Sequence, residues 1–118
     1  MSKFPAMPTE VIETMSRRPV DIGSPFGKCD LHHAIISKGM ITGLPDREKV
    51  KIHDPRNLLK VEHSVHLSKP LPSPIRAARM LSMIYGKSEI LEWLRSIEWR
   101  YGIPRSDISE LINQLESN

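Results

Sequence analysis

The sequence contains little cysteine, which cross-links small folds, and few aromatic residues, which fill their cores. Cys29 is the only cysteine among 118 residues, and phenylalanine, tyrosine and tryptophan occur twice each. One cysteine excludes an internal disulfide and a four-cysteine zinc knuckle, so any metal must be held by His, Asp, Glu or Asn. So few aromatic side chains also limit the hydrophobic core.

Long apolar runs are also missing. No stretch approaches the roughly 20 apolar residues that a membrane span needs, and the opening MSKFPAMPTEVIE lacks the apolar centre of a secretory signal. We therefore expect a cytoplasmic protein with no membrane partner. Ten prolines predict short elements separated by many stops.

Positive charge is concentrated in the middle of the chain, although the net charge is only +3. Residues 28–79 carry ten Lys and Arg against five Asp and Glu, whereas residues 80–118 carry four against six. A basic middle segment favours a polyanionic partner such as nucleic acid. On charge alone, an ordinary solvated surface explains the same count equally well.

Capping residues and hydrophobic spacing predict a mixed set of elements. Two short strands, at about residues 28–33 and 57–61, pair as an antiparallel hairpin around a long charged loop, and a short helix follows over residues 62–69. Further helices are expected over residues 9–17, 74–85, 88–99 and 106–115, with caps at Thr9, Ser73 and Ser106. We expect one α+β domain over residues 1–118, with a helical C-terminal extension at residues 73–118.

All five histidines fall within one 35-residue window of the basic segment, at His32, His33, His53, His63 and His66. Imidazole is a common metal ligand and the usual general base near neutral pH, so such a group indicates a chemical site. Adjacent strand residues point to opposite faces, so His32 and His33 can take different tasks. Asp30 shares a strand face with His32 and could orient its ring, although a surface acid is equally compatible with the pattern.

The order of these residues resembles a known family. CDLHHAIISKG and IHDPRNLLKVEHSVHL place 23 residues between His33 and Asn57, and eight between Asn57 and His66. This is similar to the HNH endonucleases of the ββα-metal (His-Me finger) fold, where a strand ending in paired histidines precedes a loop, a strand opening with Asn, and a helix with a final His. The resemblance covers residues 28–70, and YGKSEILEWLRSIEWRYGIPR resembles the tail of small phage or prophage HNH proteins.

The resemblance implies specific roles. His33 would be the general base, His32 and His66 the metal ligands, and Asn57 the residue that fixes the loop and the His33 imidazole. Independently, the Asn57 amide can bond the backbone of the long loop, although a simple turn residue would fit the same place. His63 lies three residues before His66, where it could approach the metal, and we favour a contact to phosphate.

Two other features bear on the site. Many family members carry His or Asn four residues after the final His, whereas this chain has Pro70, which cannot ligate; the ion would then have two protein nitrogens. Mg²⁺ or Mn²⁺ suits such an open site, and two imidazoles also attract Zn²⁺ or Ni²⁺. His53 is expected to be a turn or hydrogen-bonding residue. Basic residues that surround the motif and could pair with phosphates include Lys28, Lys38, Arg56, Lys60 and Lys69.

The expected function is hydrolysis of DNA phosphodiester bonds, as nicks or double-strand cuts, by a His base and one divalent metal. DNA is the expected partner. If the protein is encoded by a phage, packaging or recombination proteins are further expected partners. One alternative is an inactive nucleic-acid-binding or phage assembly and packaging accessory protein of the same fold. Another is a helical interaction module with a structural ion, which would unfold on chelation.

Overall fold

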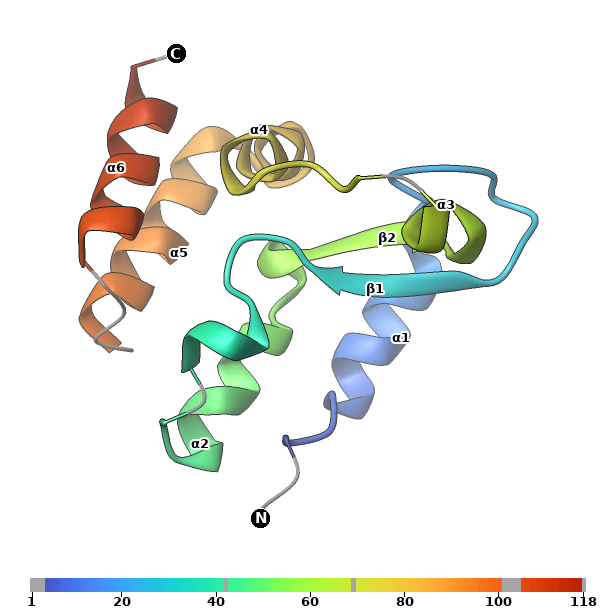
Figure 1. Cartoon of the computed structure of the whole chain (residues 1–118), viewed down its shortest axis with the longest axis horizontal. Helices are drawn as coiled ribbons and strands as arrows, with labels where there is room; N and C mark the ends of the chain where they lie inside the picture. Colours follow the sequence, from blue (N-terminus) through green and yellow to red (C-terminus); the bar gives the residue numbers. More distant parts are fainter. Residues whose placement is uncertain (1–3, 42, 69, 101–104, 118) are drawn as a thin grey trace.

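The fold is built around a two-stranded antiparallel sheet, with helices on its faces and beyond its end (Figure 1). The computed structural model describes residues 4–41, 43–68, 70–100 and 105–117. Strand β1 spans Cys29–His33 and β2 spans Leu58–Glu62, with Cys29 opposite Glu62 and His33 opposite Leu58. Helix α3, His63–Ser68, follows β2 directly. The predicted hairpin, the short helix and the α+β class are confirmed.

The connection between the strands contains more regular structure than its glycines and prolines predict. Single helical turns occupy Lys38–Ile41, Asp46–Lys49 (α2), Val50–His53 and Pro55–Asn57. The last turn is capped by Asp54, whose Oδ1 accepts from the Arg56 amide at 2.8 Å. Turns this short display no 3.6-residue repeat, so the sequence predicted only a long charged loop where the structure has a series of helical turns.

Helix α1, Thr9–Arg17, packs beside the hairpin. Its N-cap position is held by Pro8 with no side-chain cap bond, so the predicted capping role of Thr9 is wrong. Its other end is tied to β2 because Lys60 Nζ donates to the carbonyls of Met15 and Arg18, each at 2.9 Å. A cation at a helix C-terminus also meets the negative end of the helix dipole.

Three C-terminal helices gather at one side of the molecule, beyond the end of the hairpin (Figure 1). They are α4 at Pro74–Tyr85, α5 at Lys87–Arg100 and α6 at Arg105–Glu116, and they confirm the predicted helices. Ser73 is at the N-cap position of α4 as predicted but makes no side-chain cap bond, and the predicted cap at Ser106 is wrong because α6 begins one residue earlier. One buried apolar cluster joins them to the hairpin and its connection, including Ile36, Leu59, Leu81, Leu94 and Ile112. None of the helices in the described part of the chain has the length and apolar character that crossing a membrane requires.

Asn57, at the entry to β2, holds the long connection in place. The side chain is fully buried. Its Oδ1 accepts from the amides of Ile35 and Ile36 at 3.0 and 2.8 Å, and its Nδ2 donates to the carbonyls of Ile36 and Ile52, both at 2.9 Å. Both donors and both acceptor lone pairs of the amide are therefore used. This confirms the predicted bonds to the loop backbone.

We expect Asn57→Ala to lower the free energy of unfolding by about 3–4 kcal/mol, because four hydrogen bonds worth about 1 kcal/mol each are lost from a buried position. Urea denaturation followed by circular dichroism measures the loss. Asn113→Ala, at an exposed position on α6, is the matched control and should stay within about 0.5 kcal/mol of the wild type. Similar stabilities for the two variants would contradict this account of Asn57.

Candidate functional site

The alternation of strand β1 sends the two adjacent histidines to different surroundings, as the sequence predicts. The ring of His32 lies beside that of His66 on α3, with centroids 5.6 Å apart. The ring of His33 lies instead beside that of His53 in the connection, with centroids 5.0 Å apart. One doublet therefore contributes to two different side-chain groups, and each can be assigned its own chemistry.

Asp30 organises the side of the hairpin that faces α3. Its Oδ2 accepts from Nδ1 of His63 at 2.7 Å and from Nδ1 of His66 at 2.9 Å. The hydrogen bond from His66, followed by that from His63, holds the pKa of the Asp30 carboxyl below its usual value, so it is ionised near neutral pH. A carboxylate only accepts, so both Nδ1 atoms carry hydrogen, and Nε2 is the nitrogen through which His66 can bind a metal.

This arrangement differs from the expectation that Asp30 orients His32. The carboxylate contacts the two α3 histidines instead, because α3 turns back onto the hairpin immediately after β2. The side chain of His63 is 44% exposed. Its predicted contact to phosphate stays a prediction, and its observed partner is Asp30.

His32 and His66, which the family resemblance implies as metal ligands, lie side by side. Burial, followed by the proximity of His66, lowers the pKa of His32, and the neutral imidazole is the form that binds metal. Across the described residues, no group of three or more His, Cys, Asp or Glu side chains is arranged to hold a metal. Binding of a divalent ion by His32 and His66 stays a prediction, and such an ion would have two protein nitrogens.

His33 has the properties of a neutral, partly enclosed base. Burial, followed by the electrostatic effect of His53, Lys38 and His32 nearby, lowers its pKa from 6.5 to about 4. Its Nε2 lies 2.9 Å from Nδ1 of His53. The expectation that Asn57 itself fixes the His33 imidazole was wrong, because the Asn57 amide is fully used by backbone groups and the ring is held by His53.

The basic residues proposed for nucleic acid fall into two groups. Lys60 and Arg56 are already engaged, since Lys60 closes the end of α1 and Arg56 makes two side-chain bonds to Asp54 at 2.9 and 2.8 Å. Their predicted role in binding phosphate is therefore not supported by their contacts. Lys28 and Lys38 are exposed, and Lys38 lies close enough to His33 to lower its pKa. Lys69 lies outside the described residues.

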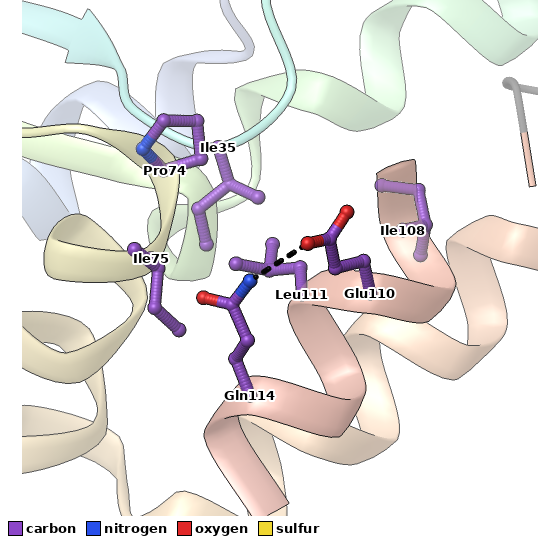
Figure 2. A pocket seen from close by; sticks show the side chains of 7 residues that line it. All are labelled: Ile35, Pro74, Ile75, Ile108, Glu110, Leu111 and Gln114. Atoms are coloured by element: carbon purple, nitrogen blue, oxygen red, sulfur yellow. Dashed lines mark hydrogen bonds between the residues drawn. The ribbon is translucent and has the colours of Figure 1, made fainter. Parts of the chain in front are cut away.

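A separate groove of about 390 Å³ lies between the connection, α4 and α6 (Figure 2). Within the described part of the chain, its lining contains no histidine and is largely apolar, with Ile35, Ile75 and Leu111 among its walls. Gln114 Nε2 donates to Glu110 Oε1 at 3.2 Å across its rim. The groove lacks the paired titratable groups that the hairpin carries, so we place the chemistry at the histidines.

The low pKa of His33 gives a test that uses folding alone. The unfolded chain binds a proton at His33 below about pH 6.5, whereas the folded chain binds it only near a pKa of about 4. Protonation therefore favours unfolding, and the free energy of unfolding falls as the pH is lowered from about 6.5 to 4. We expect His33→Gln to remove about 1–2 kcal/mol of that fall, a range reduced for solvent screening of a half-buried ring. Urea denaturation near neutral pH and near the folded pKa measures it, and identical losses in both proteins would contradict the assignment.

Comparison with protein-family models found no significant match, and comparisons with curated proteins and with solved structures found none either. The resemblance of residues 28–70 to HNH nucleases therefore stands on the order of the motif residues. In the structure, the ring of His32 lies beside that of His66, and the ring of His33 lies beside that of His53.

Proposed function

We propose that the protein is a metal-dependent endonuclease that hydrolyses DNA phosphodiester bonds. One observation carries the proposal. The hairpin and α3 bring the rings of His32 and His66 together, with centroids 5.6 Å apart, while the ring of the adjacent His33 lies beside His53. The order hairpin then helix, over residues 28–70, also supports a ββα-metal core. A hydrolase of this kind needs two functions close together, one to activate water and one to neutralise charge, and the doublet separates them.

His33 is the proposed general base. Its ring is neutral near pH 7, so one nitrogen has a lone pair that can take a proton from the attacking water. A base with a pKa of about 4 is weak, but a DNA phosphate brought beside it adds negative charge that favours the protonated ring and raises that pKa. Substrate binding thus strengthens the base at the time when it is needed.

His32 and His66 are the proposed metal-binding pair. When bound, a divalent ion would supply positive charge beside the scissile phosphate and the leaving oxygen. Asp30 fixes the hydrogen of His66 on Nδ1 and so directs its other nitrogen away from the carboxylate. Water and a phosphate oxygen would fill the positions that the two protein nitrogens leave open.

The second candidate is a nucleic-acid-binding or phage assembly protein of the same fold that does not cleave. Two observations favour it: the described residues bring no third metal-ligating side chain to His32 and His66, and the pKa of His33 is low in the free protein. Both candidates predict binding to DNA, so cleavage is what separates them.

We expect the purified protein to nick or linearise supercoiled plasmid with Mg²⁺, Mn²⁺ or Ni²⁺, and we expect EDTA to stop the reaction. His33→Ala should reduce the rate by about 10²–10⁴-fold, because it removes the proton acceptor. Calorimetric titration with Ni²⁺ should give similar affinity for His33→Ala and wild type, and weaker affinity for His66→Ala. If wild type and His33→Ala are equally inert with every metal while still binding DNA, the second candidate replaces the nuclease.

We also expect Lys38→Gln to weaken binding to duplex DNA and to reduce the slope of log affinity against log salt by about 1, as for one lost phosphate contact. Fluorescence anisotropy with a labelled oligonucleotide at several salt concentrations measures both. Arg95→Gln is the charge-matched control because Arg95 is paired with Glu116 at 3.0 Å, away from the hairpin on α5. Equal effects from the two variants would show that only net charge matters.

A further inference from the structure

A chain of hydrogen bonds runs from the proposed base into the segment before α1. Nε2 of His33 lies 2.9 Å from Nδ1 of His53, and Nε2 of His53 lies 2.9 Å from the carbonyl oxygen of Pro5. His53 is only 4% exposed, so both of its nitrogens meet protein groups. The three groups come from strand β1, the connection and residues 4–8, which are far apart in the sequence.

The carbonyl at the end of this chain determines where the hydrogens lie. The oxygen of Pro5 has no hydrogen to donate, so Nε2 of His53 must carry one. In the neutral ring, Nδ1 of His53 is then an acceptor, and the hydrogen between the two rings belongs to Nε2 of His33. Nδ1 of His33 is left with the lone pair.

We propose that His53 is a positioning residue that holds His33 in the tautomer with hydrogen on Nε2, so that Nδ1 is the nitrogen that takes the proton from water. The inference rests on the proposed function for its catalytic meaning, but the tautomer is a property of the free protein. His53 does not touch the substrate in this scheme; it acts only through His33. A histidine that could flip or change tautomer would present the wrong nitrogen for part of the time.

The surroundings of His53 fix its ring. The edge of Phe4 packs against it, with centroids 5.7 Å apart and the rings nearly perpendicular. The ammonium groups of Lys38 and Lys49 lie 5.1 and 5.8 Å from the centroid of the Phe4 ring, so two cations from the connection contact Phe4. The segment before α1 is thus packed onto the connection at the point where His53 needs its acceptor.

Asn57 also helps to position His33, but indirectly, through His53. Its Nδ2 donates to the carbonyl of Ile52, the residue directly before His53. This bond fixes the backbone from which the His53 side chain extends. The role that the family resemblance implies for Asn57, holding the imidazole of His33, is therefore carried out here through His53.

The test measures the tautomer and the rate separately. Long-range nitrogen–proton correlation spectra of ¹⁵N-histidine-labelled protein report which nitrogen of each ring carries hydrogen, with no metal or DNA present. Plasmid cleavage then gives the rate for the same samples. Two variants form a matched pair: His53→Phe keeps a ring against Phe4 but has no acceptor, and His53→Gln can accept from His33 with its oxygen and donate to Pro5 with its nitrogen.

We expect the Nε2-hydrogen tautomer at His33 in the wild type, a mixture of tautomers in His53→Phe, and recovery of the wild-type form in His53→Gln. Cleavage should fall by about 10–100-fold in His53→Phe, as for other groups that orient a working histidine, and recover in His53→Gln. Ni²⁺ affinity should stay within about twofold in both variants, because His32 and His66 are untouched.

Two outcomes would overturn the inference: a wild-type His33 with hydrogen on Nδ1, or a His53→Phe protein whose His33 tautomer and cleavage rate match the wild type. If His53→Phe does not fold, the wild-type spectrum and His53→Gln still decide the matter. If no protein cleaves DNA but the tautomers behave as expected, the proposed function fails while the positioning role of His53 stands.

Discussion

The arrangement of the site depends on one buried amide. Asn57, the residue directly before β2, binds Ile35 and Ile36 at the exit of β1 and Ile52 near the end of the connection. A buried amide with all four hydrogen-bonding positions used has one favourable orientation, because any other leaves backbone groups unpaired. Both ends of the connection are therefore fixed relative to the hairpin, and His53 is fixed with them.

Two acceptors at opposite ends of the site then determine how the histidines can act. The Asp30 carboxylate places hydrogen on Nδ1 of His63 and His66, and the Pro5 carbonyl places it on Nε2 of His53. Neither acceptor can donate, so each ring nitrogen that faces one of them must carry hydrogen. Through the bond between His53 and His33, the Pro5 carbonyl also sets the tautomer of His33. On the α3 side of the hairpin, Nε2 is then the nitrogen of His63 and His66 that faces away from the carboxylate, and on the other side Nδ1 is the nitrogen of His33 without hydrogen. The proposed metal site uses Nε2 of His66, and the proposed base uses Nδ1 of His33.

The sequence predicts the elements better than it predicts the partners. The hairpin, α3 and the C-terminal helices follow from hydrophobic spacing and prolines, which are local signals. The capping residues were a poorer guide, because neither Thr9 nor Ser73 makes a side-chain cap bond. The separation of His32 from His33 follows from strand alternation alone. By contrast, the bond between His53 and Pro5 joins residues 48 positions apart, and no local pattern marks a backbone carbonyl as an acceptor. The sequence also does not predict that Lys60 binds the end of α1, because no local pattern distinguishes a lysine with protein partners from one that can bind phosphate.

The same burial that defines the site also limits it in the free protein. Desolvation is the largest cause of the lowered pKa values of His32 and His33, and nearby cationic or potentially cationic groups add to it. Neutral rings are what metal binding and proton acceptance require, so this environment suits the roles that we propose for both histidines. It also makes His33 a weak base until an anion arrives, because only added negative charge can offset burial and the proximity of Lys38. A polyanionic substrate would supply that charge, which links the strength of the base to the presence of the phosphate it is proposed to act upon.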